Sequence, residues 1–236
     1  MKKLLLLLAL LFAPALSDAL TVSDIRSQVR LRIKDLDSTR QRYTDAQLLG
    51  IFNEGQRDVI GATLALGTQR SFLSIPAGTT MYQLTGADEE IIQVYRVVFN
   101  DANLNELDIK QIDSDNNNAS FFGTVGTPTA FYVRKDLPGY VGLYPTPNFG
   151  TGTLRVSYHK YPDDLTGDSS VPYDGAVNLY TYHNLLIYHA CMTIFAVEGD
   201  FNKSAFYKTL YDAGLQVMNE NLGERRINFK VPKETK

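Results

Sequence analysis

The sequence predicts an α+β fold: a helical body built from N-terminal helices plus a C-terminal helical hairpin, with an inserted antiparallel β-sheet region. Two observations predict it. Amphipathic helical patterns occupy residues 23–69 and 174–222, whereas short β-branched and alternating patterns occupy residues 70–173. Residues 1–22 then remain as an N-terminal apolar segment, and residues 223–236 as a C-terminal extended arm rich in Lys and Arg.

Composition limits the classes of protein to consider. The 236 residues are 44% hydrophobic and 21% charged, which is typical of a folded chain rather than a disordered one. The formal net charge of -3 gives no general argument for binding a nucleic-acid duplex. A single cysteine, Cys191, excludes a disulfide within the chain and a cysteine-based metal site.

The first twenty residues have the three parts of a secretory signal. Lys2 and Lys3 precede an apolar run, Leu4–Phe12, and Ala13-Pro14-Ala15 follows as a site of small residues. Two interpretations stay open. Cleavage of this segment, up to Ala19, would place the protein in the periplasm, whereas a retained segment would be an arm that buries its leucines on a partner.

A first helix is expected from Asp24 to about Leu36, with Ser23 as its cap. Its apolar side carries Ile25, Val29, Ile33 and Leu36. Its other side carries four cations that could meet phosphates or an acidic partner, or simply face solvent: Arg26, Arg30, Arg32 and Lys34.

The second helix, Thr44–Leu66, is the best marked element of the sequence. Thr44 and Gln47 form a capping box, Tyr43 and Leu48 a hydrophobic staple, and Gly67 the expected stop. Its apolar stripe, which indicates one buried side, is Leu48, Phe52, Gly55, Val59, Ala62 and Leu66.

The middle of the chain alternates strand and turn signals, which indicates a small antiparallel sheet or a barrel-like sandwich. Asp113–Gly126 is expected to be a long polar insertion. Ile91–Phe99 predicts a strand covered on both sides, Leu137–Tyr140 a type II turn, and Thr153–Tyr161 a strand with one wet side. The other strand-like runs are Ser71–Leu84, interrupted by a turn at Pro76–Gly78, and the hairpin arms Phe131–Arg134 and Tyr140–Tyr144.

A helical hairpin is predicted at the end of the chain. The helix Asp174–Val197 is apolar nearly all round and is therefore expected to be buried, or shared with a neighbouring subunit. Glu198-Gly199-Asp200 breaks the chain, and Asp200 caps a last helix that reaches about Leu222. The apolar stripe of that last helix is Phe206, Leu210, Ala213 and Val217.

Motifs for catalysis or for cofactors and metals are missing from the sequence. Asp113–Asn118 looks like a calcium loop, but Thr124 stands where the bidentate Glu is needed and Asn118 where the Gly is needed. His183 and His189 are six residues apart on a helix and face apart, so each is expected to make one hydrogen bond. Cys191 is interpreted as a small core residue. We expect neither an enzyme nor a cofactor or metal site.

The order of the features resembles the adaptor, or head–tail connector, proteins of tailed bacteriophages. The resemblance spans about Thr21–Leu222 and ends with the helical hairpin from Asp174. The earlier segments that carry it are SDIRSQVRLRIKD, YTDAQLLGIFNEGQRDVI with Asn53–Gln56 in mid-helix, IPAGTTMYQL, IIQVYRVVF and YVGLYPTPNFGTGTLRVSYHKYP.

This resemblance implies a structural virion protein without enzymatic activity, assembled in the host cytoplasm. It implies a ring of identical subunits, commonly a dodecamer, that docks under the portal protein. Such a ring extends the channel for DNA, passes the DNA without sequence-specific binding, and offers an attachment site to a downstream tail or stopper protein. Arg26, Arg30, Arg32 and Lys34 would then be channel or interface cations. The C-terminal arm would contact the portal through Arg225, Arg226, Ile227, Phe229, Lys230 and Val231.

An alternative from another class stays open. The chain could be an exported periplasmic or cell-surface protein that binds a saccharide or peptide through a Tyr-rich β region. The tyrosines concerned are Tyr132, Tyr140, Tyr144, Tyr158 and Tyr161.

Overall fold

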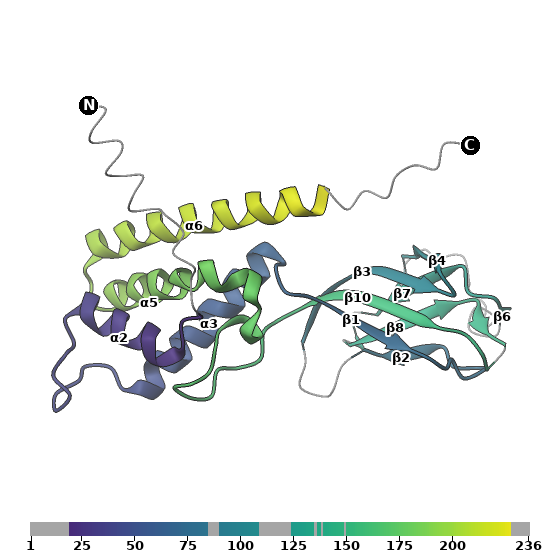
Figure 1. Cartoon of the computed structure of the whole chain (residues 1–236), viewed down its shortest axis with the longest axis horizontal. Helices are drawn as coiled ribbons and strands as arrows, with labels where there is room; N and C mark the ends of the chain where they lie inside the picture. Colours follow the sequence, from purple (N-terminus) through teal and green to yellow (C-terminus); the bar gives the residue numbers. More distant parts are fainter. Residues whose placement is uncertain are drawn as a thin grey trace. The chain divides into compact units, whose positions relative to one another are not determined.

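Two compact units make up the chain. The computed structural model describes residues 19–84, 90–108, 124–134, 136–137, 139–148 and 150–227. A helical unit comprises the described residues up to Thr63 and from Pro162 onward, and a β-rich unit comprises Leu64–Tyr161 (Figure 1). The α+β class is thus confirmed, while the β-rich unit begins and ends earlier than the predicted residues 70–173.

The helical unit is built around α5. This helix buries side chains on nearly every side and packs against three other helices, α2, α3 and α6 (Figure 1). The predicted burial of this helix on nearly all sides is therefore confirmed, and helices of the same chain provide it. The helical elements are α2 (Val22–Ile33), α3 (Asp45–Thr63), η1 (Tyr173–Gly175), η2 (Val177–Tyr182), α5 (Asn184–Val197) and α6 (Phe201–Ile227).

Helix α2 begins and ends earlier than predicted. Its cap is Thr21 rather than Ser23, because Thr21 and Asp24 form a capping box: the Asp24 amide donates to Thr21 Oγ1 at 3.3 Å and the Thr21 amide donates to Asp24 Oδ2 at 2.9 Å. At the other end, Lys34 adopts a left-handed conformation at φ 58°. Leu36 consequently lies outside the helix and is 66% exposed, not packed in its apolar stripe.

The start of α3 is confirmed and its end is not. The Thr44 amide donates to Gln47 Oε1 at 2.8 Å, and the Gln47 amide donates to Thr44 Oγ1 at 3.2 Å. The helix stops at Thr63 because Leu64, at φ 51°, turns the chain, so Gly67 is not the stop but the first residue of β1.

Three sheets form the β-rich unit. Their strand orders are β1-β10-β3-β4, β2-β8-β7-β5 and β6-β9, and all pairs are antiparallel except the parallel pairs β5–β7 and β6–β9. Buried side chains of the two four-stranded sheets share one core, so these sheets pack face to face as a sandwich. The strands are β1 (Gly67–Phe72), β2 (Met81–Gln83), β3 (Ile91–Phe99), β4 (Ala102–Asn103), β5 (Asn105–Glu106), β6 (Val125–Gly126), β7 (Ala130–Val133), β8 (Tyr140–Tyr144), β9 (Thr146–Pro147) and β10 (Leu154–Lys160).

Several strand predictions are confirmed. Strand β3 has the predicted bounds, β7 and β8 form the predicted hairpin, and β10 buries Leu154, Val156 and Tyr158 on one face. Gly139 has φ 85°, as the third position of a type II turn requires.

One expectation for the sheets was wrong: strand β3 is not covered on both sides, because Tyr95 is 50% exposed and Arg96 is also exposed. The run Ser71–Leu84 holds two strand segments on either side of a turn, as predicted. The two strands lie in different sheets, since β1 pairs with β10 and β2 with β8. Of the polar insertion, residues 113–123 lie outside the described residues, and Val125–Gly126 forms β6.

The C-terminal hairpin differs from its prediction in three ways. Asp174 does not open a long helix, since 3-10 turns occupy residues 173–182 before α5 begins. Helix α6 continues through Gly223 to Ile227, so the arm predicted from residue 223 starts as helix. The predicted stripe of α6 faces outward, as described below. The cap is confirmed, because Asp200 Oδ1 accepts from the Lys203 amide at 3.2 Å.

Candidate functional site

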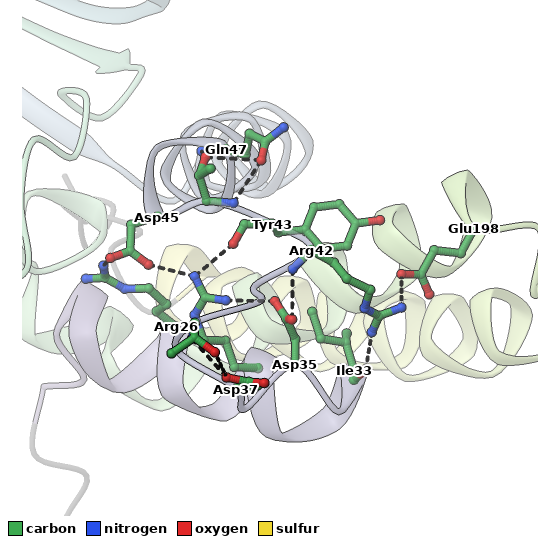
Figure 2. Close-up of polar contacts among 12 residues, drawn as sticks. Arg26, Ile33, Asp35, Asp37, Arg42, Tyr43, Asp45, Gln47 and Glu198 are labelled. Carbon is green, nitrogen blue, oxygen red and sulfur yellow. Dashed lines mark hydrogen bonds and ion pairs between the residues drawn. The ribbon is translucent and has the colours of Figure 1, made fainter.

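The predicted basic face of α2 is divided by burial. Arg30 is buried and donates to Asp35 Oδ2 at 2.7 Å, to Asp45 Oδ1 at 2.7 Å and to the Tyr43 carbonyl at 2.9 Å. Figure 2 shows these two carboxylates and Tyr43 converging beside α2. The hydrogen bond from Arg30, together with the nearby Arg26, lowers the pKa of Asp45 against the opposing effect of burial.

Arg26 is held in the same way, by Asp45 at 2.5 Å and by Asp168. These two arginines are therefore not a solvated face, because each is enclosed by carboxylates of its own unit. The remaining two cations are more accessible: Arg32 is half-buried and donates to the Gln28 carbonyl at 3.1 Å, and Lys34 is exposed.

A short loop ties the end of α2 to the end of α5. Arg42 donates to the Ile33 carbonyl at 2.5 Å and pairs with Glu198 at 2.5 Å, while its amide donates to Asp35 Oδ1 at 3.0 Å (Figure 2). These contacts fix the loop on the helical unit. Beside them, Leu31 and Leu36 are 62% and 66% exposed and, with Arg32 and Lys34, form an accessible patch that is both apolar and basic.

The middle of α3 holds the segment that leads back from the β-rich unit. Asn53 Oδ1 accepts from the Leu165 amide at 2.7 Å, and Asn53 Nδ2 donates to the Leu165 carbonyl at 3.3 Å. Gln56, fully buried, donates to the Asp163 carbonyl at 2.8 Å and accepts from the Tyr173 amide at 3.3 Å. We call this pair, Asn53 and Gln56, the amide clamp.

No role was predicted for the amide clamp from the sequence. Its signal is present, however: two amide side chains three residues apart share one side of a helix and flank Gly55. A Cβ at Gly55 would lie 2.8 Å from His189 Nδ1, so glycine permits the close approach of α3 and α5. The clamp is a structural device: Gln56 Nε2 also donates to Asn53 Oδ1 at 3.2 Å, and the four hydrogen bonds that hold the returning segment are all to its backbone.

His183, His189 and Cys191 are buried in the helical unit. His183 Nδ1 accepts the one predicted hydrogen bond, from the Leu20 amide at 3.1 Å, and burial lowers the pKa of His183 to about 4. His189 Nε2 lies 3.3 Å from Asp58 Oδ2. Burial raises the pKa of the Cys191 thiol to about 12, which confirms a core residue rather than a nucleophile. Within the described part of the chain, no three His, Cys, Asp or Glu side chains gather to hold a metal ion.

Two of the five tyrosines predicted to form a binding face are buried in the sandwich: Tyr132 and Tyr158, at 2% and 4% exposure. Tyr132 lies over Gly142, where a Cβ would come within 2.1 Å of its ring, so its position depends on the glycine opposite it in the hairpin. The other three, Tyr140, Tyr144 and Tyr161, are half-buried.

Helix α6 also carries exposed apolar side chains. The residues at the predicted stripe spacing are Phe206, Leu210, Ala213 and Val217, and we call them the α6 stripe; three of them are exposed and Leu210 is half-buried. Phe206 is 59% exposed and Val217 is 51% exposed. At the tip of the hairpin, Val197 and Phe201 are 76% and 72% exposed.

The structure describes only three of the six residues predicted to contact a portal. Arg225, Arg226 and Ile227 belong to the last turn of α6, whereas Phe229, Lys230 and Val231 lie outside the described residues. Across the described ranges, no helix is both long enough and apolar enough to cross a bilayer.

A comparison with protein-family models decides the family. The model described as SU10 adaptor protein matches residues 20–232, which include every element of both units. The chain belongs to this family. The SU10 adaptors are a phage head–tail adaptor family, so the role is that of a phage structural protein, found in the virion with other head and tail proteins. A comparison with curated proteins found no match.

Proposed function

We propose that the chain forms an oligomeric ring at the head–tail junction, docks under the portal, extends the DNA channel and provides the attachment site for tail or stopper proteins. The observation that carries the proposal is the adaptor-family match across both units. We further propose that the protein has no enzymatic activity and acts by geometry alone, and that the ring, commonly a dodecamer in such adaptors, assembles in the host cytoplasm.

In this proposal the helical unit is the body of the ring. Its buried centre is α5, and the ion pairs of Arg30 and Arg42 together with the amide clamp fix the surrounding segments. A subunit stiffened in this way can keep the same shape around a ring. The β-rich unit is then the part that meets tail components.

The pairing of the α2 arginines and the low net charge of the chain support the passage of DNA. Arg26 and Arg30 are neutralised by carboxylates of their own unit, and the formal net charge of the chain is -3. A channel that lets DNA slide should make few phosphate contacts, because each contact adds to the binding free energy. Arg32 and Lys34 are the two of the predicted cations that we propose for a partner or for DNA.

We place the portal contact at the C-terminal end of the chain. The start of the arm is moved from the predicted residue 223 to the end of α6. Because α6 runs to Ile227, Arg225 and Arg226 belong to this helix, and we propose the arm for the residues after it. Phe229 and Val231 are the apolar residues that would anchor it.

The test uses the full chain with the portal protein of the same phage. Native mass spectrometry should give one ring mass for the chain alone and a combined mass with the portal. F229D/V231D should keep the ring mass and the circular dichroism spectrum but lose the portal complex. T235D/K236Q, which makes the same charge change of -2 near the end of the arm, should dock normally. A chain that stays monomeric with and without portal would contradict the proposal.

A further inference from the structure

Helix α6 carries an apolar stripe that the described part of the chain leaves largely exposed: Phe206, Ala213 and Val217 are exposed, and Leu210 is half-buried. The spacing of the α6 stripe, four, three and four residues, is that of a helix face which packs on another apolar segment. The buried side of α6 is a different one, marked by Tyr211 and Met218 at 8% and 0% exposure. Helix α6 therefore has two apolar sides, and α5 accounts for only one.

The described chain begins beside the C-terminal end of this stripe. The Leu20 amide donates to His183, and the hydroxyl of the neighbouring Tyr182 accepts from Asn221 Nδ2 at 2.8 Å. Asn221 lies one turn beyond Val217 and about 40° around the helix, since each residue turns about 100°. The two hydrogen bonds thus lead from the start of the described chain to the flank of the α6 stripe.

The residues before that point include a segment of matching length and chemistry. Leu4–Phe12 is apolar throughout, and only residues 13–19 separate it from Leu20. Those residues can reach about 24 Å when extended. The α6 stripe, from Phe206 to Val217, is about 16 Å long at 1.5 Å per residue. The apolar run is therefore within reach of the whole stripe.

We propose that Leu4–Phe12 packs on the α6 stripe of its own chain. The leucine side chains would cover Phe206 and Val217, and the segment would become a retained part of the helical unit rather than a leader that is removed. This inference concerns the free chain and does not depend on ring assembly or portal docking, so each can fail without the other.

Disulfide trapping on the full chain tests the proposal. Cys191 is fully buried with its thiol pKa raised to about 12, so it leaves a silent background for two new cysteines. L8C/A213C should form an intrachain disulfide on mild oxidation, seen by non-reducing electrophoresis and peptide mapping. The matched control is L8C/N219C. Asn219 is exposed on α6 but lies about 160° around the helix from Val217, so this pair should stay reduced.

Three results would overturn the proposal. A disulfide that forms between two chains would show that a second copy reaches the stripe instead. An intact mass that lacks the first 15 to 19 residues would show that the segment is a leader. L8C/A213C that stays reduced, or that oxidises no faster than L8C/N219C, would show that the segment does not lie on the stripe.

Discussion

Arg30 joins three stretches of the helical unit through one guanidinium. It leaves α2, meets Asp35 in the following loop, and reaches Asp45 and the Tyr43 carbonyl at the start of α3. Asp35 is 4% exposed, so its charge depends on these partners. A buried carboxylate that loses its cation is strongly destabilising, whereas an exposed lysine contributes little.

Arg30→Met should therefore lower the free energy of unfolding by about 3 kcal/mol, because it leaves Asp35 buried without its cation. Urea denaturation of the full chain measures the change. Lys34→Met, which removes a nearby exposed cation, should change the free energy of unfolding by less than about 0.5 kcal/mol. Equal effects of the two substitutions would mean that Arg30 is not a structural residue.

His183 should make stability depend on pH. Burial lowers its pKa to about 4, below the unfolded value near 6.5, so between these values the unfolded chain binds more protons. The stabilisation is complete above pH 6.5 and is lost as the pH falls toward 4, by about 3 kcal/mol in total. Thermal melts between pH 4 and 7 should show this slope.

The control for this prediction is His183→Gln, which can keep an acceptor for the Leu20 amide but does not titrate. Relative to His183→Gln, the wild-type protein should lose about 3 kcal/mol of stability as the pH falls from 7 toward 4. A difference that stays constant from pH 4 to 7 would show that His183 is not responsible.

At the scale of elements, α3 is the helix to which the other parts of its unit are fastened. Its amide clamp holds the returning segment, and Gly55 allows α5 to come close. Two of its three glycines, Gly50 and Gly55, serve different needs. A Cβ at Gly50 would meet nothing within 4 Å, whereas at Gly55 it would meet the His189 ring.

Gly50→Ala should therefore raise the free energy of unfolding by about 0.5–1 kcal/mol through helix propensity alone. Gly55→Ala gains the same propensity but must displace a buried imidazole, so we expect a net loss of about 1–3 kcal/mol. Chemical denaturation of the matched pair decides the matter. A stabilising Gly55→Ala would mean that α3 and α5 have room to separate.

Local signals in the sequence were enough to predict several elements. The Thr44–Gln47 capping box, the bounds of β3 and the alternation in β10 depend on neighbouring residues, and the structure has all three. The end of α3 was missed because a left-handed leucine, Leu64, ends it, and no residue preference marks such a position.

Local signals could not predict which side of α6 faces α5, or that carboxylates enclose two of the α2 cations. Spacing identified the apolar residues of α6, but its side facing α5 is set by Tyr207, which stacks on Phe195 at 5.8 Å, and by Tyr211 and Met218. The burial of Arg30 and Arg26 was missed because two of their carboxylate partners are distant in sequence: Asp45 lies 15 residues from Arg30, and Asp168 lies 142 residues from Arg26. The amide clamp was missed for the same reason.

At the scale of the whole molecule, the β-rich unit is an insertion whose two ends meet. Strands β1 and β10 pair along their length, and the Lys160 amide donates to the Leu66 carbonyl at 3.2 Å. The unit also has its own core of buried side chains from both sheets. An insertion with adjacent ends and a separate core can fold independently.

Residues 64–161, expressed alone, should therefore unfold cooperatively and give a dispersed amide NMR spectrum. The helical unit, with Thr63 joined to Pro162 by a short Gly-Ser linker, should keep its helical circular dichroism. If the excised β-rich unit were unfolded while the full chain is folded, its core would not be self-sufficient.

The amide clamp also has a consequence for the order in which the protein is made. Gln56 leaves the ribosome long before its partners, which lie 107 and 117 residues later in the chain. The β-rich unit is complete once Tyr161 has emerged, and domains generally fold as units during synthesis. The inserted β-rich unit can therefore fold first. At that stage the Gln56 side chain of α3 still lacks the backbone partners that it has when buried in the folded protein. The helical unit becomes whole only when translation has passed the last helix, so a prematurely terminated chain would carry a finished β-rich unit on an unfinished body.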